Sequence, residues 1–235
     1  MGLGRLRADI RQWGWARALF IRLMSQLQRH AGLRVYRVNL RPLTRRACAP
    51  DVSSGIALRV PTPEELRKAG DDPDLDMRPD FVRDALARGD IAFGAFDGDR
   101  LVGYTWRTFA AAPHIDGLWV TVDRPYQYSY KGFTRPSHRR RRIHAAITYF
   151  ADVYLLERGH AAEVGFTEVT NLASLAVADF MGRRKIGYAG HMNWFGSKAS
   201  FRTPAVKKIG VALFERSLNA DYVKLTRRQA SLKGR

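Results

Sequence analysis

The chain is 235 residues long, which is enough to bury a sizeable core as one domain, or as one domain with an appendage. Its apolar content of 46% excludes a disordered chain, and its single cysteine, Cys48, excludes an internal disulfide and fits a reducing cytosol. The formal net charge of +18 favours polyanionic partners, namely nucleic acid, an anionic membrane surface or phosphate-bearing substrates.

The positive charge is concentrated in two parts of the sequence. Residues 1–46 contain eleven arginines and a single acid, Asp9, and residues 183–235 contain thirteen basic residues and two acids. Residues 64–99 have the opposite balance, with eleven acids and five bases. This asymmetry indicates basic surfaces that bind polyanions, although a basic protein that is merely soluble fits the same composition.

Residues 3–28 are predicted to form one long amphipathic helix, because apolar residues recur three and four apart. Trp13 and Trp15, together with arginines on the polar side, are typical of a helix that lies in a membrane interface. A helix packed on its own domain, or on a second copy of the chain, is the alternative. Gly32 is predicted to end this helix, and Leu33–Leu40 alternates as an edge strand does.

No apolar run reaches the roughly 18 residues that a membrane-spanning helix requires. Arginines recur through the N-terminal stretch, where a secretory signal would be continuously apolar. The sequence therefore predicts a cytoplasmic protein, with peripheral association at the inner face of the membrane if the N-terminal helix is an anchor.

The next segments carry clear local signals. Ile56–Val60 is predicted to be a short strand, and Thr62 with Glu65 three residues later is a capping box that opens a helix. The pair Asp97 and Gly98 lies between two apolar runs, which predicts a β-hairpin.

The stretch at 126–150 is the most informative part of the sequence. Residues 126–134 are rich in aromatic and β-favouring side chains and predict a strand, and a helix is expected to begin near Arg140. Five arginines fall within residues 135–142, between these two elements. Because a helix start exposes unpaired N–H groups and the positive end of its dipole, this corner is predicted to bind phosphate.

Two motifs and a hairpin stand out in this order of elements. PSHRRRRIH at Pro136–His144 follows a strand and opens a helix, and FDGDRLVGY forms the earlier hairpin. Asn171 with Ser174 follows the next predicted strand and leads through a helix to KIGY at Lys185–Tyr188. Together with the element order, these motifs resemble the GNAT superfamily of acyl-CoA N-acyltransferases over residues 56–195.

The resemblance implies an α/β (α+β) fold with a mixed central sheet flanked by helices. To this fold the sequence adds an N-terminal amphipathic helix and a basic C-terminal helical tail. The chain is therefore expected to have three parts: an appendage of amphipathic helix and edge strand (1–50), a GNAT-like acyltransferase domain (51–197) and the basic tail (198–235).

The arginine run departs from the family's pyrophosphate loop, which is usually written Arg/Gln-x-x-Gly-x-Gly/Ala. Arg139 matches the leading Arg, but Arg142 and His144 stand where the family has small residues. Glycines let the backbone approach a diphosphate closely, whereas guanidinium groups bind phosphate bidentately from farther out. We therefore expect the donor to be acyl-CoA held farther out, or an acyl-phosphopantetheine arm on an acidic carrier protein. An arginine run that contacts lipid headgroups or RNA is the alternative.

The resemblance also implies roles for individual residues. The backbone of Phe133 and Thr134 is expected to contact the acyl carbonyl and the pantetheine, and Glu168 to act as a base or to bind the amine. Ala178 occupies the position at which the family often has a tyrosine that protonates the thiolate, which leaves that role to Tyr188 or to water. The remaining residues expected to bind the donor are Arg139, Arg140, Arg141, Arg142, Ile143, His144, Asn171 and Ser174.

The sequence thus predicts an N-acyltransferase that moves an acyl group from a thioester donor to an amine, at the membrane surface. Alternatives are a soluble acetyltransferase for a small amine or protein, with the N-terminal helix packed in a homodimer, and an inactive module that binds RNA or anionic lipid. Asn171 is equally suited to capping its helix, and Glu168 to being an ordinary strand-end residue. The histidines lack metal-ligand spacing and cysteines are not paired, so no metal site is expected.

Overall fold

The computed structural model describes residues 10–45, 55–114, 118–194 and 197–215. The chain divides into two compact units. The first unit contains the residues up to Asn39 together with Phe166–Ile209, and the second contains Leu40–Gly165 together with the residues from Gly210 onward. Strands β1 (Arg34–Pro42) and β8 (Ala162–Glu168) run through both units.

The second unit is built on a mixed sheet with the strand order β8-β7-β4-β3-β2. Its first pair, β7 with β8, is parallel, and the other neighbours are antiparallel. The strands not yet bounded are β2 (Ile56–Arg59), β3 (Ile91–Asp97), β4 (Arg100–Thr108) and β7 (Tyr126–Thr134). A mixed sheet covered by helices is the predicted fold class, which is thus confirmed.

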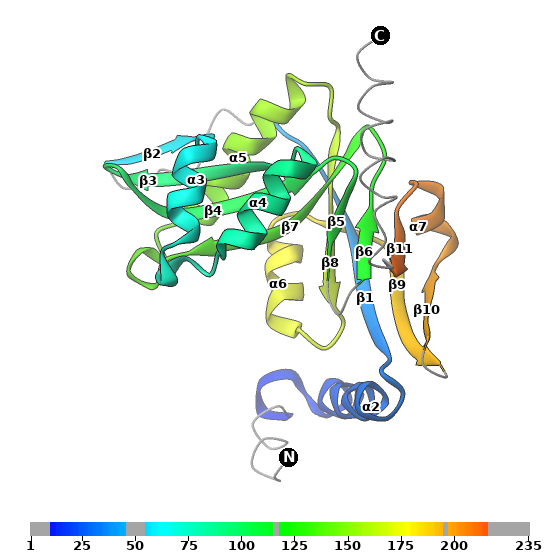
Figure 1. The fold of residues 1–235 in the computed structure, drawn as a ribbon. Helices are drawn as coiled ribbons and strands as arrows, with labels where there is room; N and C mark the ends of the chain where they lie inside the picture. The colour runs from blue at the N-terminus through cyan, green and yellow to red at the C-terminus, as the bar shows by residue number, and fades with distance from the viewer. Residues whose placement is uncertain (1–9, 46–54, 115–117, 195–196, 216–235) are drawn as a thin grey trace. The chain divides into compact units, whose positions relative to one another are not determined.

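Helices cover both faces of this sheet (Figure 1). One face is covered by α3 (Pro63–Gly70) and α4 (Pro79–Arg88), with a 3-10 turn, η1 (Pro73–Leu75), between them. The other face is covered by α5 (Ile143–Leu156). The predicted capping box is present, since Thr62 accepts a hydrogen bond from the Glu65 amide and the Glu65 carboxylate accepts one from the Thr62 amide.

Each helical layer has its own core. On the α3–α4 side, helix residues meet β3 and β4 through Leu66, Ala69, Val82, Ala85, Ala92, Phe96, Tyr104 and Trp106. On the α5 side, the helix meets the same strands through Phe93, Ala95, Val102, Ile143, Ile147, Ala151 and Leu155. The three- and four-residue spacing of the α5 positions is the period from which the helix was predicted.

A buried ion-pair cluster joins four elements of the second unit. The Arg41 guanidinium of β1 donates to both carboxylate oxygens of Asp152 on α5, at 2.6 and 2.7 Å, and to Glu163 of β8 at 2.8 Å. Arg107 of β4 approaches the same Glu163 oxygen at 3.4 Å. Burial opposes the charge on Arg41, but hydrogen bonds and coulombic attraction from Asp152 and Glu163 outweigh it and raise the pKa of Arg41.

A small antiparallel sheet completes the second unit, with the order β11-β6-β5. Its strands are β5 (Ala111–Pro113), β6 (Leu118–Thr121) and β11 (Ala212–Glu215).

The first unit combines part of β1 and β8 with segments from both ends of the described chain. Its strand order is β10-β9-β1-β8. The other elements are α2 (Trp15–Ala31), α6 (Leu172–Phe180), β9 (Arg184–Trp194), β10 (Ser197–Arg202) and α7 (Pro204–Lys208). No helix within the described ranges is both long enough and apolar enough to cross a bilayer.

The predicted edge strand at Leu33–Leu40 is not an edge. It is part of β1, which lies between β9 and β8, and the side chains of Tyr36, Val38 and Asn39 are buried. The basic residues of this strand are tolerated inside the sheet because carboxylates neutralise them, as Asp179 does for Arg37 at 2.7 Å.

The single helix predicted for residues 3–28 is interrupted. A helical turn at 10–13 ends at Gly14, whose φ of 83° and ψ of 159° lie outside the helical region, and α2 starts at Trp15. Glycine adopts such a conformation without the steric cost that a Cβ imposes, so the chain bends there. Residues 3–9 lie outside the described part of the chain.

The helical tail predicted for 198–235 is wrong over its described part. Residues 197–215 form a strand, a short helix and a second strand, and residues 216–235 lie outside the described ranges. Strand β10 pairs with β9, and Gly190 leaves room for the Phe201 ring, which a Cβ on that glycine would meet at 2.6 Å. Gly210, at a φ of 72°, follows the short helix.

We predict that Arg41→Met destabilises the protein by about 3–5 kcal/mol, because it leaves Asp152 buried without its cation and Glu163 with only the more distant Arg107. Urea unfolding followed by circular dichroism measures the change. The matched control is Arg83→Met, whose partner Asp84 is also exposed, and it is expected to cost at most about 1 kcal/mol. Equal losses in the two variants would contradict a special role for the buried cluster.

Candidate functional site: a basic corner after strand β7

The site begins at an unpaired edge of β7. The parallel pairing of β7 with β8 covers three residue pairs, from Tyr126 with Ala162 to Tyr128 with Val164. Strand β7 continues to Thr134, paired with β4 on its other side. Beyond Tyr128, no strand in the described part of the chain pairs with the edge of β7 that faces away from β4. The backbone groups along that edge are therefore available to a ligand.

The first arginine after β7 has a structural role. Arg135 is buried, donates its Nε–H to the Leu101 carbonyl at 2.9 Å, and forms ion pairs with Asp72 and, at 3.6 Å, with Asp74. The bonds from Arg135 also lower the pKa of the Asp72 carboxyl. This arginine therefore fixes the loop to η1 and is not a ligand. In the following 3-10 turn η2 (Pro136–His138), the ring of His138 is held in the same way by Asp97, at 3.1 Å.

Three of the next four arginines have no ion-pair partner among the residues that the structure describes. Arg139, Arg140 and Arg142 are exposed and form no ion pair with any described residue. Arg139 donates its Nε–H to the Thr134 carbonyl at 3.3 Å, which places it against the end of β7. Arg141 is half-buried and has a partner of its own.

The backbone of this loop turns in an unusual way just before α5. Arg140 and Arg142 have φ values of 64° and 57°, in the left-handed region that favours glycine. Arg142 is the N-cap of α5, and no side chain caps this helix. The helix therefore begins directly after uncompensated guanidinium groups, and its positive dipole end adds to their field.

Two strand glycines allow the start of α5 to lie close to the sheet. A Cβ on Gly103 of β4 would meet Ile143 at 3.1 Å, and a Cβ on Gly132 of β7 would meet the His144 ring at 3.0 Å. Ile143 is buried and anchors the first turn, while His144 lies over β7. Both residues fix the position of the helix start, and their predicted contact with the donor stays a prediction.

The aromatic end of β7 is also packed inward. The Phe133 ring stacks on Tyr104, with centroids 6.0 Å apart, and Thr134 is half-buried. Both pair with β4 through their backbone, so only backbone contacts of the predicted kind fit these two residues. In the second unit, the sequence therefore brings together Phe133, Thr134 and the run Arg139–His144.

The other predicted site residues lie in the first unit. Asn171 is the N-cap of α6, and its side chain accepts a hydrogen bond from the Ser174 amide at 3.0 Å. Glu168 lies 3.6 Å from Arg34, with its side chain partly exposed. Tyr188 of β9 is exposed at 37% and lines a cavity. The side chain of Asn171 therefore caps α6, which is one of the two roles expected for this residue.

Metal ligands are not gathered anywhere in residues 10–45, 55–114, 118–194 or 197–215. Within those ranges, no group of three or more His, Cys, Asp and Glu side chains is arranged to hold an ion.

Comparison with known proteins gives structural similarity without sequence matches. No protein-family model matches the chain, and no curated protein does either. Among solved structures, the chain is similar to a tandem GNAT protein from the clavulanic acid biosynthesis pathway, with 15% identity, a TM-score of 0.46, and 74% of this chain and 68% of the other covered.

Two further solved structures are of the same kind. A GCN5-related N-acetyltransferase from Sphaerobacter thermophilus has 15% identity and a TM-score of 0.45, with 78% of this chain and 56% of the other covered. The Salmonella typhimurium protein yncA, solved with its cofactor acetyl-CoA, has 10% identity and a TM-score of 0.38, with 71% of this chain and 97% of the other covered. The first two of these three structures carry the name of the superfamily that the sequence motifs resemble.

We predict that Arg142→Gly is more stable than Arg142→Ala by about 1 kcal/mol, because only the alanine keeps a Cβ in the left-handed conformation. Both variants remove the guanidinium, so their difference reports on the backbone alone. The same pair at Arg139, where φ is −66°, is the control and is expected to show alanine equal to or better than glycine. Thermal unfolding of the four variants measures the difference in stability between glycine and alanine at each position. The same difference at both positions would contradict the described loop conformation.

Proposed function

We propose that the protein is a GNAT-type acyltransferase that moves an acyl group from an acyl-CoA thioester to an amine. The observation that carries the proposal is the basic corner at residues 134–144. There, within the described residues, a strand edge without a pairing partner leads through Arg139, Arg140 and Arg142, which form no ion pair, into a helix N-terminus without a side-chain cap. This combination supplies the groups that bind a diphosphate: guanidinium forks, helix N–H groups and a positive dipole end.

The free edge of β7 supplies the second element that acyl transfer requires. Attack of an amine on a thioester develops negative charge on the carbonyl oxygen, and backbone N–H groups stabilise that charge. We assign this role to those backbone N–H groups at Phe133 and Thr134 that point away from β4, beside the corner proposed to hold the phosphates. The sheet fixes these groups through β4, so no reorganisation is needed during the reaction.

The residues that the resemblance implies for the proton transfers lie in the first unit, and their roles stay predictions. Glu168 is a partly exposed carboxylate paired with Arg34 at 3.6 Å, which is the type of group that accepts a proton. Tyr188 has an exposed hydroxyl-bearing ring at 37%, which is the type of group that donates one. Ala178 is buried in α6 and has no proton to give, which supports Tyr188 or water in that role.

We predict that CoA binds more weakly by roughly tenfold or more when Arg139→Glu and Arg140→Glu are combined, because charge-assisted bonds to phosphate are replaced by repulsion. Isothermal titration calorimetry with CoA and with acetyl-CoA measures the effect. The matched control combines Arg124→Glu and Arg158→Glu, which changes the net charge equally near the other end of α5 and is expected to leave binding unchanged.

The outcome also separates the alternatives. Wild-type protein that binds neither CoA nor acetyl-CoA, but binds an acyl carrier protein, would assign the donor to the carrier. No heat with any of the three would overturn the proposal and leave a binding module for anionic polymers or lipid.

Helix α2 supports peripheral membrane association as part of the proposal. Its exposed apolar side chains recur four apart, with exposed fractions of 72% for Trp15, 59% for Leu19, 57% for Leu23 and 38% for Leu27. Only Ala18 of this helix is buried, and arginines at 17, 22 and 29 are exposed beside the stripe. An apolar stripe flanked by cations is the composition of a helix that lies in an anionic membrane surface.

We predict that Leu19→Ser with Leu23→Ser reduces binding to phosphatidylglycerol vesicles at least tenfold, because about 1.5–3 kcal/mol of apolar transfer is lost per leucine. Vesicle flotation measures the bound fraction. The control is Val177→Ser with Phe180→Ser, which removes two exposed apolar side chains of α6 and is expected to leave flotation unchanged. Wild-type protein that stays with the soluble fraction would contradict membrane association and favour a soluble acetyltransferase.

A further inference from the structure

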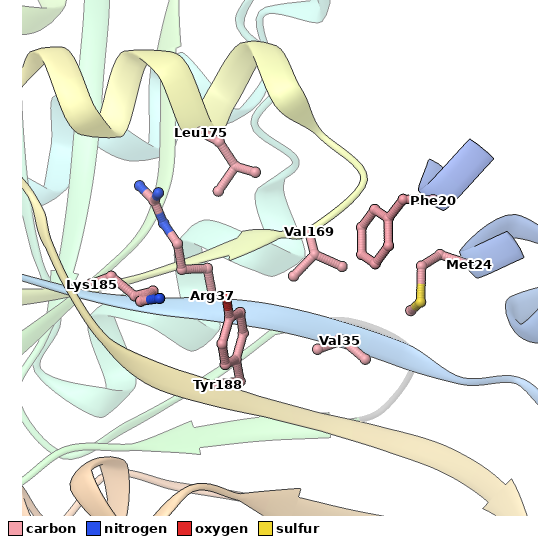
Figure 2. Close-up of a pocket in the computed structure, with 8 residues that line it drawn as sticks. All are labelled: Phe20, Met24, Val35, Arg37, Val169, Leu175, Lys185 and Tyr188. Carbon is pink, nitrogen blue, oxygen red and sulfur yellow. The ribbon is translucent and has the colours of Figure 1, made fainter. Parts of the chain in front are cut away.

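The first unit contains a cavity of about 470 Å³, and Tyr188 is the one residue of its lining that the acyl-transfer proposal names (Figure 2). Its volume is within the range of small-molecule sites. One end is apolar and is formed by two side chains of α2 together with residues from β1, α6 and the segment after β8. These residues are Phe20, Met24, Val35, Val169 and Leu175.

The other end of the cavity is cationic. Figure 2 shows Arg37, Lys185 and Tyr188 on the side away from α2. Lys185 is exposed and forms no ion pair with any described residue, and its nitrogen lies 5.4 Å from the centre of the Tyr188 ring. The Arg37 guanidinium is bound to Asp179 at 2.7 Å, and its buried Nε–H has no hydrogen-bond partner within the described ranges.

We propose that this cavity binds a single-chain anionic amphiphile, with its hydrocarbon tail between α2 and α6 and its carboxylate or phosphate at Lys185 and Tyr188. An apolar end excludes a fully polar ligand, because burying polar groups there without hydrogen bonds is costly. A lysine without a carboxylate partner excludes a cationic headgroup and supplies a charge-assisted hydrogen bond to an anionic one.

The surface of α2 supports a lipid-like ligand over other apolar anions. Phe20 lines the cavity and is also 43% exposed, so it connects the apolar end of the cavity to the helix surface. The neighbouring Leu19 and Leu23 are more than half exposed. A tail that enters from an apolar surface would therefore remain in contact with apolar side chains along its way.

The test uses the full chain and calorimetric titration below the critical micelle concentration of each probe. The probes are dodecanoate, 1-dodecanoyl lysophosphatidate and dodecyltrimethylammonium. We expect at least one of the two anions to bind and the cation of the same chain length to bind at least tenfold more weakly. Dodecanoate binding would identify the ligand as a fatty acid, and lysophosphatidate binding alone would identify it as a phospholipid with one acyl chain. Failure of both anions, or equal binding of the cation, overturns the proposal.

Two variants locate the binding site. Lys185→Gln is expected to weaken binding of the anion about threefold to tenfold, whereas Lys208→Gln, an exposed lysine on α7 of the same unit, is expected to leave it unchanged. Equal effects of the two lysine variants overturn the proposal.

Blocking the apolar end gives the second location test. Leu175→Trp fills this end and is expected to reduce binding more than tenfold. If that variant does not fold, as judged by its melting temperature, Phe20→Ala removes a partly exposed tail contact without burying new volume and is expected to weaken binding severalfold. Binding that is unchanged in the folded variant overturns the proposal.

This inference goes beyond acyl transfer and does not depend on it. The titrations contain neither CoA nor an amine, and all the residues concerned lie in the first unit, whereas the arginine corner lies in the second. If the protein binds dodecanoate but not CoA, the amphiphile site stands and the proposed acyltransferase activity falls. If it binds CoA but neither anionic amphiphile, the activity stands and the amphiphile site falls.

Discussion

Arg41 joins β1, α5 and β8 through one guanidinium group, and the position of the candidate site depends on this buried cluster. Asp152 holds α5 by two short hydrogen bonds, and Glu163 holds β8 beside Gln127 of β7, close to the last residues at which these strands pair. Because buried charges are costly unless they are paired, the cluster permits few alternative arrangements of these elements. It therefore fixes the helix whose N-terminus forms the phosphate corner.

The loop arginines differ from one another in burial and in their partners. Arg135 is buried and satisfied by Asp72 and a backbone carbonyl, whereas Arg139, Arg140 and Arg142 are exposed and lack acidic partners within the described ranges. One arginine thus holds the loop, and we propose that the three exposed ones bind a ligand. Positive φ values at two of these residues show that the backbone adopts a glycine-like path even though the side chains are large.

Local signals predicted much of the fold. The capping box at Thr62 and the hairpin turn at Asp97 and Gly98 depend on hydrogen bonds and φ values within a few residues, so the sequence encodes them directly. The place of β1 inside its sheet could not be read in this way, because its neighbours β8 and β9 are distant in the sequence. The same holds for β10, whose formation depends on the space that Gly190 leaves for Phe201.

The sequence showed where the arginines concentrate, but not what each of them contacts. The density of arginines between a strand and a helix marked the basic corner, but no pattern separated Arg135, which meets distant acids, from its neighbours. The packing of His144 and Ile143 against strand glycines had no sequence signal either, because the glycines lie in other elements. The cationic cavity near Tyr188 had no sequence signal, since its lining comes from five separate segments.

Hydrogen exchange with and without acetyl-CoA tests the central claim most directly, namely that the edge of β7 and the start of α5 hold an acyl thioester. At saturating acetyl-CoA, the account predicts slower amide exchange in residues 129–134 and 139–146 than in the free protein, with no change in the β3–β4 hairpin turn. Unchanged exchange in both segments, with protection elsewhere or nowhere, would contradict it.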